Sequence, residues 1–234
     1  GQVAQKRAGI NVGTYYASEI DKYAIAITQK NHSETVQLGD MTKWREWDID
    51  WSSIDLLTAG FPCQAWSTAG KQKGDTDPRG ALVHDLIDIW KFCSKHNPGM
   101  KFIFENVRMK REFLDYINEL FGVEPVLINS TLVSAQNRNR YYWTNIEGVD
   151  QPKDKGIVLK DILEDGEVDR AKSHCLDANY FKGGNLKSYF EKHRRQLVFS
   201  KDGLTYRKLT PVECERLQTV PDGYTEGVSN TQRY

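Results

Sequence analysis

Apolar segments with the length of strands alternate with helical patterns through the first 145 of the 234 residues. Strands are predicted at residues 14–20, 35–38, 54–58, 101–104, 125–132 and 141–144, and helices at 21–31, 80–96 and 111–121. Strands that alternate with helices usually form a mostly parallel sheet with helices on both of its faces. The sequence therefore predicts an α/β fold.

Polar or reactive side chains follow four of the predicted strands. Glu19 ends the first strand, Asp40 follows the second, Cys63 the third and Glu105 the fourth. In open sheets of this kind a ligand binds beyond the carboxyl ends of the strands. We therefore expect these four side chains to surround a site at one edge of the sheet.

The composition changes after Asn145, where a polar, acidic stretch replaces the alternating pattern. Lys and Arg balance Asp and Glu at 32 each, which argues against a uniformly basic surface. Residues 182–208 nevertheless hold eight Lys or Arg side chains and only two acidic ones, interleaved with aromatic residues. This pattern favours contact with nucleic acid, and a solvated helix face is the alternative. We predict a catalytic body at 1–145, a target-recognition region at 146–206 and a return segment at 207–234.

The four cysteines are scattered and show no CxxC spacing, so we predict no metal site. A chain of this size does not need disulfides to fold, which favours a reducing compartment. No apolar run approaches the roughly 20 residues of a membrane span, so no membrane partner is expected. A hydrophobic content of 39% excludes wholesale disorder.

Cys63 is the candidate nucleophile. It follows a buried strand and is preceded by Gly60 and Pro62, which would place it rigidly at the open edge of the sheet. A thiolate attacks electrophiles when nearby positive charge or a helix N-terminus stabilises it. The alternative is a buried, inert cysteine.

Glu105, Arg138 and Arg140 are the candidate polar partners. A carboxyl group at the end of a buried strand needs a partner and can act as a proton donor, although a side chain near a helix start is the alternative. Two arginines two residues apart share one face of an extended strand and could clamp a carbonyl or phosphate group. A solvated pair is the alternative for the arginines.

Four short motifs occur in the order and spacing of the C5-cytosine DNA methyltransferase family, which the chain resembles over nearly its full length. They are Pro62-Cys63-Gln64, Glu105-Asn106-Val107, Gln136-x-Arg138-x-Arg140 and Arg207-Lys208-Leu209-Thr210-Pro211-x-Glu213. Residues 17–24 resemble the family's second cofactor motif, and residues 16–20 and 175–179 look most like phage enzymes and the related eukaryotic de novo enzymes. The resemblance implies a Rossmann-like, S-adenosylmethionine-dependent methyltransferase fold with a small DNA-recognition region.

The resemblance also implies roles for the candidate residues. Cys63 would attack C6 of a cytosine flipped out of duplex DNA, and Glu105 would hold the base and supply a proton. Arg140, with Arg138 nearby, would contact the base carbonyl and the DNA backbone. A methyl group from S-adenosylmethionine would reach C5, leaving S-adenosylhomocysteine, and loss of the C5 proton and of Cys63 would release 5-methylcytosine.

Cofactor contacts follow from the same resemblance. Glu19 would accept the ribose hydroxyls, and Asp40 would accept from the adenine amine. Ile20 and Met41 would pack on the two faces of the adenine. The remaining implied cofactor contacts are Phe61 and Pro62. Ordinary acids at strand ends are the alternative for Glu19 and Asp40.

DNA contacts are expected from a basic segment at 64–79 and from the basic-aromatic region. A segment of this length beside the nucleophile is interpreted as a lid that closes on the DNA. The residues assigned to DNA are Gln64, Ser67, Lys71, Lys73, Arg79, Gln136, Lys182, Lys187, Arg194 and Arg195. Residues 210–213 predict the start of a helix, with Thr210 as its cap.

The chain differs from the family pattern at both flanks. The family's first strand with its glycine-rich loop and its final motif are expected to be missing from these 234 residues. An RNA (tRNA) cytosine methyltransferase and a catalytically silent DNA-binding fragment are the alternatives to a DNA-methylating enzyme. Double-stranded DNA is the expected partner, a cognate restriction endonuclease is a further candidate, and the oligomeric state is open. The expected location is the cytoplasm of a bacterial or phage-infected cell, or a nucleus for a eukaryotic protein.

Overall fold

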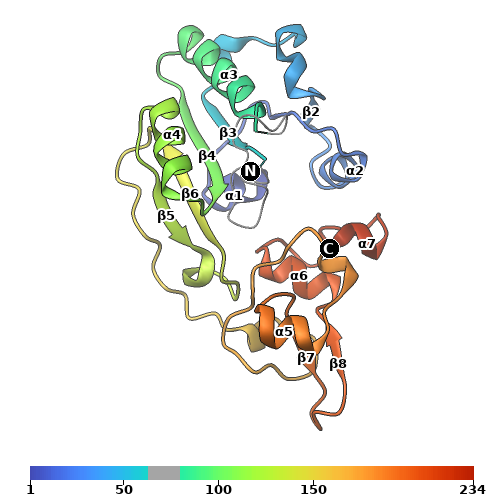
Figure 1. The fold of residues 1–234 in the computed structure, drawn as a ribbon. Helices are drawn as coiled ribbons and strands as arrows, with labels where there is room; N and C mark the ends of the chain where they lie inside the picture. The colour runs from blue at the N-terminus through green and yellow to red at the C-terminus, as the bar shows by residue number, and fades with distance from the viewer. Residues whose placement is uncertain (63–79) are drawn as a thin grey trace.

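The computed structural model describes residues 1–62 and 80–234 (Figure 1). Its central feature is a four-stranded sheet in the order β3 (Leu56–Gly60), β4 (Lys101–Val107), β6 (Asn139–Thr144) and β5 (Val126–Asn129). Strands β3 and β4 run parallel, whereas β6 pairs antiparallel with both β4 and β5. The sheet is therefore mixed. The expected strand at 125–132 ends at residue 129, where a short 3₁₀ turn at Ser130–Leu132 takes the place of a crossover helix and reverses the chain into β6.

A second, two-stranded parallel sheet pairs β1 (Tyr16–Ala17) with β2 (Val36–Gln37). Helix α2 (Lys22–Asn31) joins these strands and begins where the side chain of Asp21 accepts the backbone N–H groups of Tyr23 and Ala24. No strand among the described residues joins the two sheets. A cavity of about 910 Å³ lies between them, and both β1 and β3 contribute to its lining.

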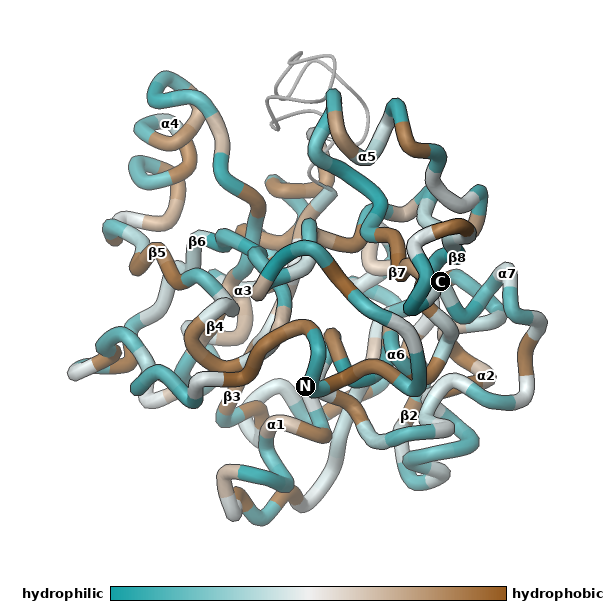
Figure 2. The backbone as a smooth tube through the Cα atoms, turned by 90° about the horizontal axis from the view of Figure 1, so that it is seen from below, coloured by the Kyte–Doolittle hydropathy of each residue, from teal (hydrophilic) through white to brown (hydrophobic). Residues whose placement is uncertain are grey.

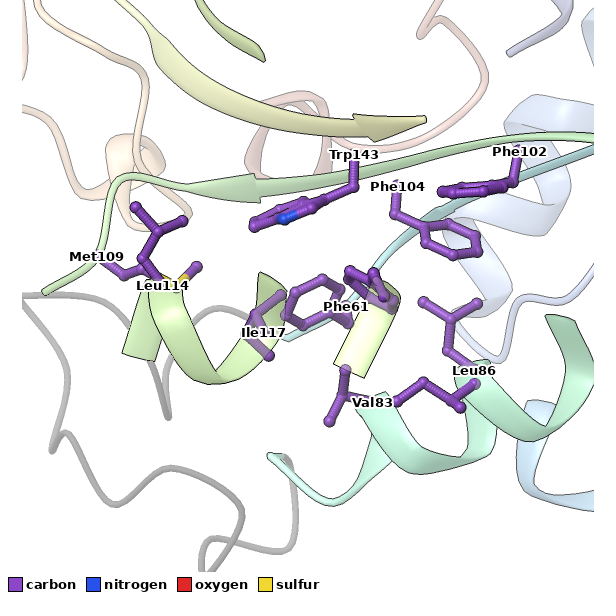
Figure 3. Packing of buried hydrophobic residues seen from close by; sticks show 11 residues of the cluster. Phe61, Val83, Leu86, Phe102, Phe104, Met109, Leu114, Ile117 and Trp143 are labelled. Atoms are coloured by element: carbon purple, nitrogen blue, oxygen red, sulfur yellow. The ribbon is translucent and has the colours of Figure 1, made fainter. Parts of the chain in front are cut away.

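The main core lies against one face of the four-stranded sheet. Helices α3 (Leu82–His96) and α4 (Arg111–Phe121) cover this face, which confirms two predicted helices. The aromatic rings of Phe102, Phe104 and Trp143 meet apolar residues of these helices in the centre of the core (Figure 3). Trp143 is fully buried and donates its indole N–H to Asn118 Oδ1 at 2.7 Å. Each such side chain contributes on the order of 2–3 kcal/mol by leaving water.

The far end of α3 packs against two 3₁₀ turns, η1 (Met41–Glu46) and η2 (Trp51–Ser53). Trp44 is buried there between the rings of Trp51 and Phe92. This aromatic cluster fixes the segment between β2 and β3. It thereby positions Met41 and Asp40 at the end of β2.

The second half of the chain forms a smaller body below the sheet in Figure 1. Its elements are η6 (Leu159–Ile162), η7 (Tyr180–Lys182), α5 (Leu186–Lys192), β7 (Leu197–Phe199), β8 (Tyr206–Lys208), α6 (Pro211–Leu217) and α7 (Asn230–Arg233). Strands β7 and β8 form an antiparallel hairpin. A separate core of buried side chains, including those of Leu159, Tyr180 and Leu209, holds the body together.

Helix α6 begins with the capping box that the sequence predicts. Thr210 Oγ1 accepts the backbone N–H of Glu213, and Glu213 Oε2 accepts the backbone N–H of Thr210. The fully buried carboxylate of Glu213 also binds Arg207 of β8 and the backbone N–H of Glu164 after η6. Glu213 therefore ties three elements of the smaller body to one point.

The segment after α6 lies against α2 of the first body (Figures 1 and 2). Asn31 donates its amide to the carbonyl of Tyr224 at 2.8 Å, and His32 contacts the Tyr224 hydroxyl at 3.1 Å. Glu215 is buried and accepts the backbone N–H groups of Gly223 and Thr225 at 2.7 Å, which fixes this turn. The short helix α1 (Gln2–Arg7) reaches the same region through Arg7, which donates to the carbonyl of Thr219 at 2.5 Å. Among the described helices, none is long and apolar enough to cross a membrane.

Candidate active site

Glu105 lies at the centre of the four-stranded sheet, in β4. Its backbone neighbours are Gly60 at the end of β3 and Tyr142 in β6. A Cβ atom at Gly60 would lie 3.3 Å from Glu105 Oε2, so the glycine leaves room for the carboxylate. Burial and the charge of Glu105 raise the pKa of Tyr142 on the other side.

The two arginines of the Gln-x-Arg-x-Arg motif converge on Glu105. Arg140 Nε lies 2.6 Å from Glu105 Oε1, and an Arg138 guanidinium nitrogen lies 3.9 Å from the same oxygen. Oε1 is buried and accepts no well-aligned hydrogen bond from the described residues, so this contact is an ion pair. The structure therefore brings Glu105, Arg138 and Arg140 together. Oε2 lies beside Gly60 at the end of β3.

Cys175 also lies in this cluster, although none of the four motifs contains it. Its Sγ atom lies 3.7 Å from Arg138 and 3.9 Å from Arg140. The thiol reaches this position because Ser173 exchanges backbone hydrogen bonds with Ala135 and Asn137, directly before the arginines. The segment 175–179 was noted only for its likeness to phage enzymes, and a thiol two residues from such a backbone bridge could not be located from spacing alone.

Asn106 links the carboxylate strand to the segment that precedes the candidate nucleophile. Its buried amide donates to the carbonyl of Phe61 at 3.1 Å, and its side-chain oxygen accepts the backbone N–H of Val107 at 2.7 Å. Cys63 itself lies outside the described residues, as do Gln64, Ser67, Lys71, Lys73 and Arg79. The Asn106 contact fixes the backbone that leads to Cys63.

Phe61 and Pro62 were both expected to touch a cofactor. The ring of Phe61 is only 6% exposed and packs against Phe121 and Trp143 in the core (Figure 3). The Phe61 side chain is therefore committed to the core. Pro62 is half-buried and stays a predicted contact.

The other predicted cofactor residues lie around the cavity between the two sheets. Glu19 and Met41 line it, and Ile20 and Asp40 directly adjoin them in the sequence. Glu19 Oε1 accepts the backbone N–H groups of Ile20 and Asp21, which leaves Oε2 for a ligand. The side chain of Ile20 is 76% exposed, so its apolar surface is open to contact with a flat ring.

Asp40 is held in place by Thr42. Asp40 Oδ1 accepts both the backbone N–H and the hydroxyl of Thr42 at 2.9 Å, and these bonds lower the pKa of Asp40. The carboxylate is therefore ionised and fixed, which suits an acceptor for an exocyclic amine. An acid with a free oxygen, a second fixed acid and an exposed apolar side chain suit an adenosyl group.

The predicted DNA contacts are unevenly exposed. Gln136 is 1% exposed, and its amide group binds the carbonyl of Leu217 and the backbone N–H of Leu176. This placement gives Gln136 a structural task, and contact with DNA stays a prediction. Arg194 and Arg195 both face Asp177, at 2.5 and 3.8 Å.

Lys182 and Lys187 are also assigned to DNA by the sequence. Lys182 lies over the ring of Phe181, with 5.5 Å between the ammonium nitrogen and the ring centre. Lys187 is exposed on α5 and has no charged partner among the described residues. Lys182 is likewise exposed, and no ion pair involves it within residues 1–62 and 80–234.

The three described cysteines are all free thiols. Burial raises the pKa of Cys93 to about 11 and that of Cys214 to about 12, so both are inert. Within residues 1–62 and 80–234, no group of three or more His, Cys, Asp or Glu side chains could hold a metal ion.

Comparison with known proteins places this site in a family. Residues 2–156 match the family described as C-5 cytosine-specific DNA methylase. A Type II methyltransferase of Neisseria lactamica, M.NlaX, is 28% identical over 275 residues, which cover 96% of this chain and 83% of the relative. M.HgiCI of Herpetosiphon aurantiacus is 38% identical over 205 residues, covering 83% of this chain and 44% of the relative.

Solved structures share the fold at low identity. The methyltransferase EhMeth of Entamoeba histolytica superposes with a TM-score of 0.67 at 16% identity, and covers all of this chain and 87% of its own. Spodoptera frugiperda DNMT2 superposes with a TM-score of 0.63 at 19% identity, and covers all of this chain and 89% of its own. These matches confirm the methyltransferase fold. The family match does not favour the RNA-methylating alternative and confirms the expectation of an enzyme that methylates cytosine in DNA at C5. By the extent of that match, this chain belongs to the C-5 cytosine-specific DNA methylase family.

Proposed function

We propose that this methylase uses Cys63 as its nucleophile and Glu105 as its acid, with Arg140 holding the acid in place. One observation carries the proposal, namely the 2.6 Å ion pair of Arg140 with Glu105 beside Gly60. Gly60 lies three residues before Cys63, and Asn106 fixes the backbone between them. The acid therefore lies next to the segment that delivers the thiol.

The chemistry follows from these positions. The target cytosine leaves the duplex, because its ring face is covered inside the stack. The thiolate of Cys63 forms a bond to C6, and the ring electrons move toward N3, which takes a proton from Glu105. C5 then gains the methyl group. Its proton passes to solvent water as the C6–S bond breaks, which returns the electron pair of that bond to Cys63 and lets N3 return its proton to Glu105. This covalent route divides one difficult substitution into easier steps.

Arg138 and Arg140 stabilise charge on the base. Arg140 is only 12% exposed, so its guanidinium acts in a site from which most water is excluded. The pair holds Oε1 of Glu105 and thereby directs Oε2 toward N3 and the exocyclic amine. The neighbouring Arg138 is placed to meet the base carbonyl or a flanking phosphate.

We assign the cavity between the two sheets to S-adenosylmethionine, which supplies the methyl group when bound. Glu19 would accept hydrogen bonds from the ribose, and Asp40 from the adenine amine. Ile20 and Met41 would enclose the adenine ring. The free Oε2 of Glu19 and the exposure of Ile20 support this assignment.

We further propose that residues 146–206 recognise duplex DNA and that 207–234 return the chain to the first body. The local surplus of basic residues supports the first part, and the contacts of Tyr224 with Asn31 and His32 support the second. A cognate restriction endonuclease as functional partner and a cytoplasmic location fit relatives that are Type II methyltransferases. Limited proteolysis between residues 145 and 207 would test the boundaries.

Transfer of a labelled methyl group to mixed-sequence duplex DNA, followed by bisulfite mapping, tests the proposed function. We expect label at cytosine C5 from the unaltered protein. Cys63→Ala should reduce the transfer to background while DNA binding, measured by gel shift, remains. The Cys93→Ala variant is the control, because that thiol is buried and inert. Cytosine methylation by Cys63→Ala would refute the nucleophile, and label on tRNA but not on DNA would refute the substrate.

A further inference from the structure

The exposed face of α5 carries two large apolar side chains with no cover from the described residues. Phe190 is 52% exposed and Leu186 is 43% exposed. The two residues are four positions apart on a helix, so they lie on the same face. Apolar side chains of this size on a short surface helix are unusual when they stand beside each other.

The opposite face of the same helix is rigidly fixed. Tyr189 is fully buried, its ring lies 4.5 Å below the guanidinium of Arg170, and its hydroxyl binds Asp169. Phe190 meets the ring of Tyr189 at 5.0 Å and that of Phe199 at 6.5 Å between ring centres. One side of Phe190 therefore packs against these two rings, while the rest of its side chain is exposed to solvent.

Helix α5 is connected to the candidate active site through the neighbouring residues His174 and Cys175. Tyr189 contacts the ring of His174 at 5.7 Å, and His174 precedes Cys175, whose thiol touches Arg138 and Arg140. We therefore expect nucleic acid that delivers a base to Glu105 to pass near α5. The helix is also flanked by positive charge that suits phosphate groups, from Lys182, Lys187 and Lys192.

We propose that Phe190 and Leu186 form a ridge that enters a groove of the duplex and contacts base edges, while Lys187 binds the adjacent phosphate. This inference rests on the proposed function and names residues that select the target sequence. A rigid aromatic or aliphatic contact distinguishes bases by their apolar groups, such as the thymine methyl. The phosphate contact adds affinity without selecting a sequence.

The experiment first maps the sequence that the unaltered protein methylates. Its affinity is then measured for a duplex with that site and for a duplex of the same composition with the site scrambled. Phe190→Ala should weaken binding to the duplex with the true site about tenfold. Its affinity for the scrambled duplex should stay within twofold of that of the unaltered protein. Phe190→Tyr keeps the ring and should retain the ratio, which separates loss of contact from loss of folding.

Two further variants complete the test. Lys187→Gln should weaken binding to both duplexes equally. It should also reduce the salt dependence of binding by the amount expected for about one phosphate contact. Leu127→Ala, in β5 and 39% exposed, is the matched apolar control outside the recognition region and should change neither affinity. An unchanged ratio in Phe190→Ala, with the unaltered protein active, would refute the ridge and leave the enzyme's function intact. Failure of the unaltered protein to methylate DNA would instead refute the proposed function.

Discussion

In the proposed mechanism, the chemistry depends most on the carboxylate of Glu105. That Glu105 adjoins the buried run 101–104 could be predicted from the sequence, although β4 continues to Val107 and places Glu105 within the strand. The ion pair of Glu105 could not, because it requires β6 to run antiparallel beside β4 and to set Arg140 opposite Val107. Cys175 was missed for a related reason, since it reaches the arginines through a backbone bridge between distant segments.

Replacing Glu105 by Gln should lower methyl transfer at least a hundredfold, because the amide retains the size of the side chain but cannot donate the proton that N3 needs. Folding should be preserved, since Glu105 is one-third exposed. Single-turnover transfer at saturating DNA, together with the melting temperature, measures both effects. Glu112→Gln, on the exposed side of α4, is the control. Near-normal transfer by Glu105→Gln would remove the acid from the mechanism.

Helices and strands differ in how well they could be predicted. The helices at 21–31, 80–96 and 111–121 appear within two residues of their predicted bounds, because caps and apolar periods are local signals. The direction of a strand is not a local property. A mostly parallel sheet was expected, but the short turn after β5 reverses the chain, and two of the three strand pairings in the four-stranded sheet are antiparallel.

Thr210 at the start of α6 provides a test of a local signal that proved correct. Thr210→Ala removes the acceptor for the Glu213 backbone N–H and should cost about 1 kcal/mol of unfolding free energy. Urea unfolding followed by circular dichroism gives the difference. Thr231→Ala, on the exposed surface of α7, should change the stability by less than half of that amount. Equal effects of the two substitutions would mean that the cap contributes nothing specific.

The stability of the complete protein should depend on pH through His174, which lies where the two bodies meet. Burial, and then the charge of Arg170, lowers the pKa of His174 from 6.5 to about 4. The unfolded chain therefore binds a proton more readily than the folded protein between pH 6.5 and 4. The stabilising contribution of the buried, neutral His174 is complete above pH 6.5 and is lost as the pH falls toward 4.

Melting temperatures measured from pH 7 to pH 4 test this dependence. His174→Asn should show a shallower decline than the unaltered protein over that interval, because it removes one group that takes up a proton on unfolding. His96→Asn, at an exposed position on α3, should follow the unaltered protein. Parallel curves for all three proteins would show that His174 is not linked to unfolding.

The separation of the two sheets has a consequence for hydrogen exchange. The ladder of β1 and β2 is two residues long and none of the residues of α2 is buried, whereas β4 is paired on both sides and carries the core. Amide protons in the first sheet should therefore exchange through local opening, orders of magnitude faster than those of β4. Addition of S-adenosylhomocysteine should slow exchange at residues 16–20 and 36–41 and leave β4 and β6 unchanged. Ligand binding at this edge would thus order residues 16–20 and 36–41 beside the more stable sheet that contains Glu105.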